Sequence, residues 1–335
     1  CWTERFESAH AGIAAFFGVS DKSRLLLTPG CTAALSVGIT DHDWQPGDRL
    51  VISAYEHHAV HRPAQLLAER GVEVVVIPPS NTGPFDLEHY RAVLESGVRL
   101  VAVSAASNVT GDLLPIPQIA ALAHQSGALT LADCAQTAGW LPMPNNVDLF
   151  AFAGHKGPQG PWGIGGLYVA PHVIMRSPEA SCDIPTDGSP PGCSDMPGYC
   201  DAGSVNRAAL AGLAAAVGLI STEEQPRRLS AARAQTERLV AGALSLGLTL
   251  HGQRDPIERM PTAAMTWAGT PPSELARLLA LRGVHASGGI QCAPLAHRTL
   301  GTDPTGVLRI SFGPSNTDDD VLAALSALSE IGAQR

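Results

Sequence analysis

The sequence predicts an α/β protein, with a large domain built on a doubly wound, mainly parallel sheet and a smaller α/β domain after it. Between residues 25 and 170, short β-rich runs alternate with segments of helical periodicity, which is typical of a parallel sheet covered by helices. After residue 203, helical and strand patterns alternate again to the end of the chain. With 335 residues, 45% of them hydrophobic, the chain is long enough for two cores.

The elements of both domains follow from apolar runs and helical spacing. Helices are expected over residues 59–70, 116–126, 206–219 and 225–246. Residues 176–203 are rich in Pro, Gly, Ser and Asp and are expected to form a long surface loop. The expected strands of the large sheet cover residues 49–54, 73–77, 100–104, 129–132, 149–153 and 166–169.

Charge and cysteine content exclude several classes of protein. A net charge of −9 and a pI near 5.7 provide no basic surface for nucleic acid or an anionic membrane. The longest apolar stretch, residues 208–220, is too short to cross a bilayer, and no signal-peptide pattern is present, so a cytoplasmic protein is expected. The seven cysteines form no CxxC pair, which argues against a disulfide framework or a metal site. The sequence begins with Cys1, which leaves open whether it is a fragment or a processed form.

Lys156 is a candidate for chemistry because lysine is rare in this chain. Lys22 and Lys156 are the two lysines, beside twenty arginines, so lysine is not the general solubilising cation here. Lys156 directly follows an expected apolar strand, in Gly154-His155-Lys156, and a lysine amine can act as a nucleophile towards a carbonyl group. The alternative is an ordinary lysine in a Gly/Pro turn between strands.

Polar residues follow several expected strands at the carboxyl edge of the sheet, where α/β folds bind ligands. Asp133 and Gln136 follow one strand, His57 follows another, and Asn108 follows a third. A carboxylate in such a place can keep a pyridine nitrogen protonated, and an imidazole can stack on a flat ring. Asp133 can instead cap the next helix, but the convergence with Lys156 favours a shared crevice.

A phosphate site is indicated at the first strand-to-helix turn. In Thr28-Pro29-Gly30-Cys31-Thr32 a tight turn leads into a helix, whose free N–H groups and the Thr32 hydroxyl can face an anion. Such turns are common in α/β proteins. The sequence contains neither a P-loop nor a GxGxxG dinucleotide fingerprint, which argues against a nicotinamide dehydrogenase.

Cys292 and Arg309 are candidates in the second domain. Cys292 lies in a Gly-rich segment, where a thiol can be a nucleophile, and the planar guanidinium of Arg309 suits the carboxylate of an amino acid. The alternative for Cys292 is a small buried hydrophobic residue, the usual fate of a free cysteine.

Taken together, these motifs resemble the class V aminotransferase superfamily of fold-type I pyridoxal-5′-phosphate (PLP) enzymes, in its cysteine desulfurase and selenocysteine lyase branch. The resemblance covers residues 6 to 331 and is specific because the motifs occur in one order. It implies a sheet of the seven-stranded type in a large PLP-binding domain over 17–210, a small domain over 211–335, and residues 1–16 packed with the small domain or linking the two. The motifs are Glu56-His57-His58, Ser107-Asn108, Asp133-Cys134-Ala135-Gln136, Gly154-His155-Lys156, Cys292-Ala293-Pro294-Leu295-Ala296-His297, and Arg309 through Asn316-Thr317.

The resemblance implies a role for each cofactor-binding residue. Lys156 would be the Schiff-base lysine and proton shuttle, His57 would stack on the pyridine ring, Asp133 would pair with its nitrogen, and Gln136 would contact its phenolic oxygen. The remaining contacts would come from Cys31 and Asn108, from Thr32 and His155 at the phosphate, and from Gly203 and Ser204 of a homodimer partner, so that active sites are shared.

For the substrate, the resemblance implies removal of sulfur from cysteine, or of selenium from selenocysteine, to give alanine. Asn108 would lie near the bound substrate, Arg309 would hold its carboxylate, and Cys292 would carry the sulfur as a persulfide and pass it to a protein acceptor. Lys156, Cys292 and His57 would be the catalytic residues.

Three departures from the family pattern leave other functions open. Ala153 replaces a phosphate-binding serine, Ser287 replaces an arginine of the carboxylate site, and the N-terminal Asp-Asn-Ala-Ala-Thr-like segment does not occur in the chain. These departures motivate a C–S β-lyase or an aminotransferase-like enzyme as the second hypothesis, and a non-catalytic PLP-fold subunit as the third.

Overall fold

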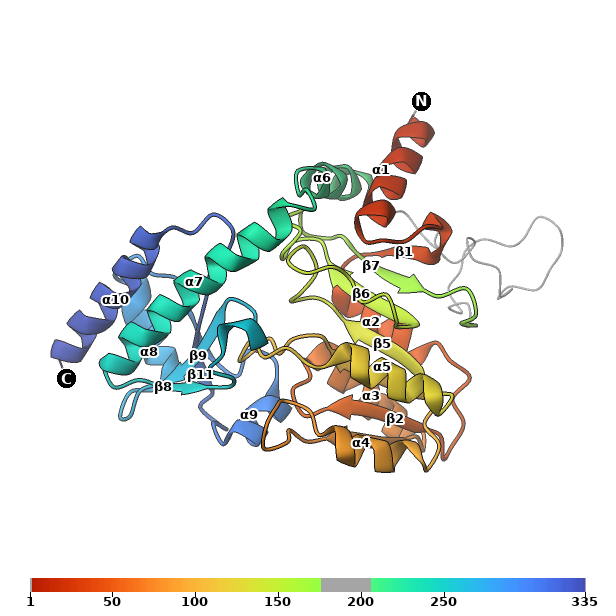
Figure 1. Ribbon diagram of the computed structural model, residues 1–335, viewed down its shortest axis with the longest axis horizontal. Helices are drawn as coiled ribbons and strands as arrows, with labels where there is room; N and C mark the ends of the chain where they lie inside the picture. Colours follow the sequence, from red (N-terminus) through yellow and green to blue (C-terminus); the bar gives the residue numbers. More distant parts are fainter. Residues whose placement is uncertain (1, 176–205, 335) are drawn as a thin grey trace.

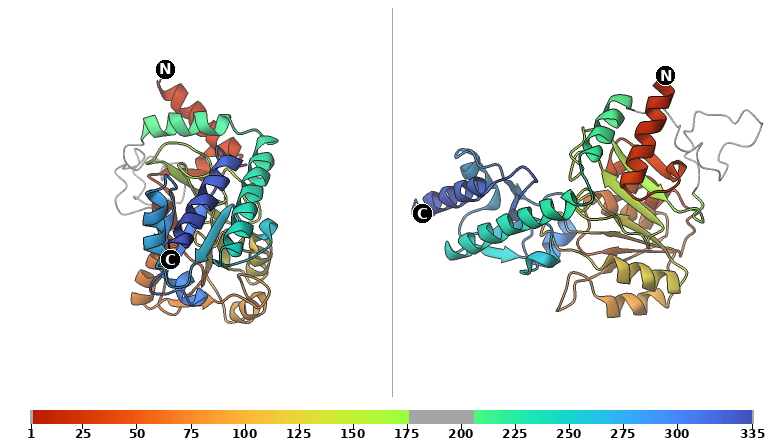
Figure 2. Two further views of the ribbon diagram at one scale, coloured as in Figure 1. Left: turned by 90° about the vertical axis from the view of Figure 1, so that its left-hand side faces the viewer. Right: turned by 45° about the horizontal axis from the view of Figure 1, so that its top comes forward.

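The described chain forms two lobes joined by the long helix α7 (Glu224–Ser245), as Figures 1 and 2 show. This computed structural model describes residues 2–175 and 206–334. The expected loop over 176–203 therefore lies outside the described residues.

The large lobe is built on a seven-stranded mixed sheet with the strand order β1-β7-β6-β5-β4-β2-β3. Strands β2 to β6 are parallel to one another, and β7 is antiparallel to both of its neighbours. This arrangement confirms the doubly wound fold. The strands are β1 (Leu25–Thr28), β2 (Arg49–Ser53), β3 (Glu73–Ile77), β4 (Leu100–Ser104), β5 (Leu129–Asp133), β6 (Leu149–Ala153) and β7 (Gly165–Val169).

Two hydrophobic cores cover the two faces of the large sheet. Successive residues of β2 alternate between them: Leu50 and Ile52 belong to one core, and Val51 to the other, as the period of two in a strand requires. The first core is closed by α2 (Cys31–Thr40) and α3 (His58–Glu69). The second is closed by α1 (Trp2–Phe16), α4 (Leu87–Leu94), α5 (Ile116–Gln125) and α6 (Arg207–Gly218).

The N-terminal helix lies elsewhere than expected. Ile13 and Ala14 of α1 are buried in the same core as Phe152 of β6 and Leu213 of α6, so α1 packs on the large sheet and not with the small domain. An apolar stripe on a helix such as α1 does not by itself say which core the stripe enters. Helix α6 continues past residue 210 on the large sheet, which moves the expected domain limit to the end of that helix.

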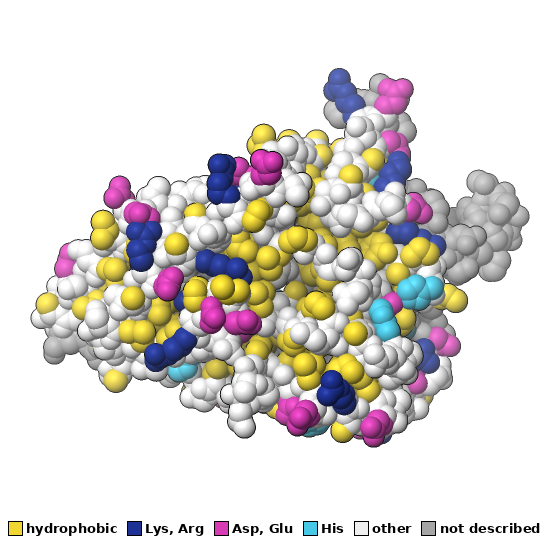
Figure 3. Space-filling model, in the orientation of Figure 1, with side chains coloured by type: hydrophobic (Ala, Val, Ile, Leu, Met, Phe, Trp, Pro, Cys, Tyr) yellow, Lys and Arg dark blue, Asp and Glu magenta, His cyan; other side chains and the backbone are white. Residues whose placement is uncertain are grey.

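The second lobe is a four-stranded antiparallel sheet covered by helices. Its strand order is β10-β11-β9-β8, and α7, α8 and α10 close its core. Hydrophobic side chains are exposed across the middle of the face in Figure 3. The elements are β8 (Thr249–His251), β9 (Thr262–Thr266), α8 (Pro272–Ala280), β10 (Ser287–Gly289), α9 (Pro294–Leu300), β11 (Val307–Ser311) and α10 (Asp318–Ala333). Short 3₁₀ helices form at Lys22–Arg24 and Pro256–Glu258.

The expected strands and helices are confirmed, with each end within one residue of its expected position. For example, the strand expected over 129–132 is β5, which also takes in Asp133. In residues 2–175 and 206–334, no helix is both long and apolar enough to cross a membrane.

Candidate active site

Polar side chains from four neighbouring strands meet at the carboxyl edge of the large sheet. His57 follows β2, Asn108 follows β4, and Asp133 is the last residue of β5. Lys156 comes three residues after the end of β6. Because parallel strands end at the same edge, these groups line one hollow.

The hollow has an inner and an outer part. The inner part is a narrow cavity of about 40 Å³, and the outer part is a chamber of about 450 Å³. Both are lined by His57, Asn108, Gln136 and Lys156. The inner cavity adds Cys31, Thr32, Leu35, Ala59, Ser104, Ala106, Asp133 and Ala135. The chamber adds six residues of the second lobe: Thr262, Ser287, Gln291, Cys292, Arg309 and Ser311.

Asp133 is held in the inner cavity by two contacts to the same oxygen. Its Oδ1 accepts a hydrogen bond from the Ala135 amide at 2.9 Å and lies 3.5 Å from the Cys31 Sγ, which donates to it. Burial, reinforced by the Asp133 charge, raises the pKa of the Cys31 thiol well above its ordinary value. Cys31 is therefore a neutral thiol that supports the carboxylate.

His57 caps α3 with its own ring. Its Nδ1 accepts a hydrogen bond from the Ala59 amide at 3.0 Å, so the neutral ring carries its proton on Nε2. Burial lowers the pKa of His57, and the nearby Asp133 carboxylate opposes that effect. The ring is thus a neutral, oriented wall of both cavities.

The loop that carries Lys156 packs closely against the turn after Gln136. A Cβ on Gly157 would lie 2.2 Å from the Ala138 carbonyl oxygen, and a Cβ on Gly139 would lie 2.4 Å from the Gly157 carbonyl carbon. Two backbones can approach this closely only where both residues lack a side chain. The glycines therefore fix Lys156 beside Gln136.

His155 lies beside the cavities without lining them. Its ring stacks on Trp162 with a centroid distance of 3.9 Å and an interplanar angle of 13°, and its Nδ1 is buried without a hydrogen-bond partner. Burial and then the Lys156 charge lower its pKa. The predicted partner contacts, Gly203 and Ser204, lie outside the described residues.

Cys292 stands on a strained loop between β10 and α9. Gln291 and Cys292 have φ angles of 46° and 58°, in the left-handed region that costs about 1–2 kcal/mol for a residue with a Cβ. The side chain is exposed rather than buried, so the alternative of a small core residue does not apply. The thiol-bearing residue instead lines the chamber that Lys156 also lines.

Arg309 connects the two lobes at the chamber. It lies on β11, directly across from Ser287 of β10, and its guanidinium donates to the Asn108 carbonyl oxygen at 2.6 Å. Burial lowers the pKa of Arg309. Ser287, where the family pattern has an arginine, therefore contributes a hydroxyl group to the wall of the chamber next to this cation.

Several residues in or next to the site were not assigned by sequence reasoning. Glu56 is fully buried and accepts hydrogen bonds from Ser104 and Ser53; burial raises its pKa to about 7. Its signal was an acidic residue three positions after the end of a buried strand. Thr262 and Ser311 line the chamber, and no motif marks them.

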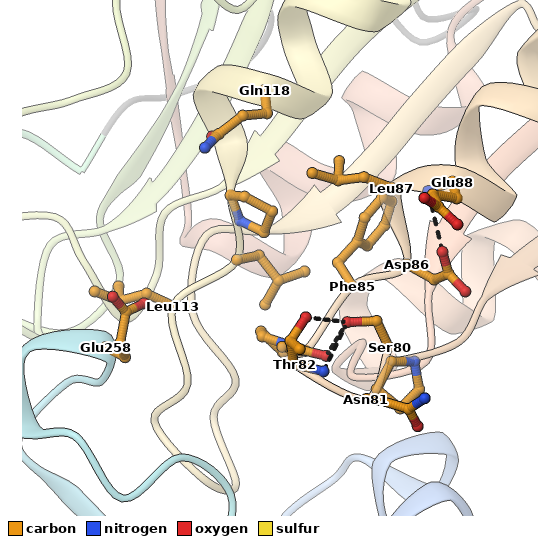
Figure 4. A pocket seen from close by; sticks show the side chains of 15 residues that line it. Ser80, Asn81, Thr82, Phe85, Asp86, Leu87, Glu88, Leu113, Gln118 and Glu258 are labelled. Carbon is orange, nitrogen blue, oxygen red and sulfur yellow. Dashed lines mark hydrogen bonds between the residues drawn. The ribbon is translucent and has the colours of Figure 1, made fainter.

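A separate cavity of about 720 Å³ lies between the segment after β3 and the segment before α5 (Figure 4). Ser80 and Thr82 bond to each other there, and Asp86 caps α4 through the Glu88 amide. None of the residues that converge at the sheet edge lines this cavity. The hollow at the sheet edge is therefore the candidate active site.

The fold and the site define the class of fold-type I PLP-dependent enzymes. The chain is similar to the apo structure of a cysteine desulfurase from Thermococcus onnurineus, with a TM-score of 0.91 and 26% identity, covering 100% of this chain and 85% of that one. It is also similar to the cysteine desulfurase CsdA of Escherichia coli, with a TM-score of 0.88 and 27% identity, over 99% of this chain and 84% of that one.

The sequence identifies the family. Residues 2–323 match the family Aminotransferase class-V. The chain is 32% identical to a probable cysteine desulfurase of Pseudomonas aeruginosa over 95% of this chain and 80% of that protein. It is 29% identical to the Escherichia coli cysteine desulfurase CsdA over 97% of this chain and 82% of that protein. The chain belongs to the class-V aminotransferase family, as its motifs predicted.

Proposed function

We propose that this chain is a PLP-dependent cysteine desulfurase that releases alanine from L-cysteine and carries the sulfur on Cys292. The observation that carries the proposal is one hollow in which Lys156 lines both parts, Asp133 lines the inner cavity, and an exposed Cys292 lines the second-lobe side of the chamber. A thiol placed opposite a lysine is expected for sulfur transfer and has no purpose in simple amino-group transfer.

The residues of the inner cavity fit PLP. Lys156 would hold its aldehyde carbon covalently, Asp133 its ring nitrogen, Gln136 its phenolic oxygen, and His57 its ring face. One buried polar atom without a partner, Asn108 Oδ1, belongs to a residue that lines both cavities and supports a bound polar group at this place. His155 Nδ1, buried beside the cavities, also lacks a partner. The phosphate would be held by the start of α2, with Cys31 beside it and the Thr32 hydroxyl, and by His155.

When bound, PLP supplies an electron sink next to the substrate α-carbon. The protein positions the groups around it. Arg309 offers its guanidinium to the α-carboxylate of the amino acid, and Lys156 Nζ can carry protons between substrate atoms. Ser287, Thr262 and Ser311 add hydroxyl groups to the same chamber.

Sulfur transfer then falls to Cys292. Its thiol sulfur bonds to the substrate sulfur while the bond from that sulfur to the substrate β-carbon breaks. L-cysteine and the Cys292 thiol become alanine and a Cys292 persulfide, so atoms and electrons balance without an added oxidant. The exposure of Cys292 favours onward transfer to a protein acceptor; selenocysteine is a substrate of the same chemistry.

The proposal includes a homodimer with shared active sites. The dimer is supported by Trp162, a large apolar side chain that stacks on His155 beside the site and is 79% exposed. Sedimentation equilibrium at micromolar concentration measures the assembly. A mass of two chains is expected, and a mass of one chain contradicts the dimer.

Product analysis tests the function. PLP-loaded protein given L-cysteine with a reductant should release alanine and sulfide in equal amounts. Cys292→Ser should retain the absorbance of bound PLP and lose sulfide release. Undiminished sulfide release from that variant would remove Cys292 from the mechanism.

A C–S β-lyase is the second candidate, and Ser287 across from Arg309 favours it because the carboxylate then has one arginine fewer to hold it. A β-lyase would release pyruvate and ammonia in place of alanine. A non-catalytic subunit would yield no product, and borohydride would trap no PLP on Lys156.

A further inference from the structure

The loop that carries Cys292 is held by the large lobe through its backbone. The Asn108 side-chain amide donates to the Gln291 carbonyl oxygen at 2.7 Å, and the His58 amide donates to the Cys292 carbonyl oxygen at 2.8 Å. These bonds fix both peptide carbonyls of the two left-handed residues. Such a conformation persists only where its surroundings determine it.

The Gln291 side chain holds the same loop from the second lobe. Its Nε2 donates to the Val307 carbonyl oxygen at 3.0 Å and to the Ser287 carbonyl oxygen at 3.3 Å. These carbonyls belong to the paired strands β11 and β10. Because both N–H groups of the amide are engaged, its Oε1 is directed to the other side.

That oxygen meets a buried histidine. His297 Nε2 lies 3.2 Å from Gln291 Oε1, and His297 Nδ1 lies 2.8 Å from Thr302 Oγ1. The His297 side chain is 0% exposed. Since Oε1 can only accept, Nε2 carries the proton, and the Thr302 hydroxyl donates to Nδ1. Burial lowers the pKa of His297, which agrees with a neutral ring.

We propose that Gln291 and His297 are positioning residues for the Cys292 thiol. The His297 ring orients the Gln291 amide, the amide ties the loop to β10 and β11, and the tied loop presents Cys292 to the chamber that Lys156 and Arg309 line. His297 belongs to the motif that begins at Cys292, and the proposed reaction gives it no other role. The inference rests on the proposed function only in taking Cys292 as the sulfur carrier.

Variants of His297 and Gln291 test the proposal in the PLP-loaded full chain. His297→Leu removes the donor to Gln291 at similar volume, whereas His297→Gln keeps an N–H donor near the place of Nε2. With His297→Leu, kcat for sulfide release from L-cysteine should fall between about 10- and 100-fold. KM and the absorbance of bound PLP should stay unchanged, and His297→Gln should recover most of the rate.

A double variant tests whether the two residues act as one unit. Gln291→Met should lose as much activity as His297→Leu, and combining both should cost no more than Gln291→Met alone, because the two changes break one arrangement. Additive losses, an unchanged kcat in His297→Leu, or no recovery in His297→Gln would overturn the proposal.

Hydrogen exchange separates this proposal from the proposed function. The His58 amide donates to the Cys292 carbonyl oxygen, so loosening the loop should speed exchange at His58 in His297→Leu and Gln291→Met, and not in His297→Gln. If wild-type protein makes no alanine from cysteine, the proposed function fails while this difference still reports on the loop. Equal exchange at His58 in all variants would overturn the positioning role.

Discussion

The two walls of the chamber are built in different ways. The large-lobe wall consists of side chains at the ends of parallel strands, where the regular register of β4 and β5 sets Ser104 opposite Asp133. The second-lobe wall carries Cys292 on a loop held by Asn108 from 183 positions earlier in the chain. The large-lobe wall is rigid because the register of its strands fixes it. The position of the second-lobe wall depends on a few polar contacts.

This difference predicts that the two walls serve different steps of the reaction. Changes in the large-lobe wall should impair cofactor binding and every reaction of the site. Changes in the second-lobe wall should leave the cofactor in place and impair sulfur transfer alone. The predictions that follow test the large-lobe wall, from the largest expected effect to the smallest.

Removal of the lysine should have the largest effect. Lys156→Ala should lower kcat by about 10³-fold or more, because no other group can hold the cofactor covalently. Borohydride reduction followed by peptide mapping should find no PLP adduct. Lys22→Ala is the matched control, since Lys22 pairs with Glu7 away from the site, and it should keep wild-type activity. An adduct remaining in Lys156→Ala would contradict the assignment.

Asp133→Asn should come next. The amide can still accept the Ala135 hydrogen bond, so the fold is expected to persist, but its missing charge no longer favours a protonated ring nitrogen. We expect kcat to fall about 10²-fold, with the absorbance of bound PLP shifted. Equal activity would show that the carboxylate charge is not used.

Gly157→Ala tests the backbone contact behind Lys156. A Cβ there would lie 2.2 Å from the Ala138 carbonyl oxygen, so unfolding free energy should drop by up to about 3 kcal/mol. Gly12→Ala is the control: a Cβ on this α1 residue meets nothing within 4 Å, and the change should stabilise by about 0.5–1 kcal/mol. Urea titration measures the change in unfolding free energy of each variant. A change of the same sign in both variants would contradict the packing argument.

Glu56→Gln should change how stability depends on pH. Burial raises the pKa of Glu56 to about 7 from an ordinary 4.5. The folded state therefore favours the protonated carboxyl. The resulting contribution to the free energy of unfolding is fully present below pH 4.5 and is lost as the pH rises through 7. As the pH rises from 5 to 8, the free energy of unfolding of Glu56→Gln should increase by on the order of 2 kcal/mol relative to that of the wild type. Parallel stability curves would contradict this.

The features that could be predicted from the sequence are those that depend on regular secondary structure. Strand ends located His57, Asn108 and Asp133 correctly, because a β-strand followed by a polar residue is a local pattern. The core that receives α1 and the partners of Gln291 were not predictable in the same way. They depend on contacts between distant segments, and neither an apolar stripe nor a lone glutamine encodes its partner.

The most direct test of the central claim is a single turnover without reductant. PLP-loaded protein is mixed with one equivalent of L-cysteine, quenched, and analysed by peptide mass spectrometry and amino-acid analysis. We expect one added sulfur atom on the peptide that contains Cys292 and one alanine for each persulfide formed. Pyruvate together with an unmodified Cys292 would contradict the account.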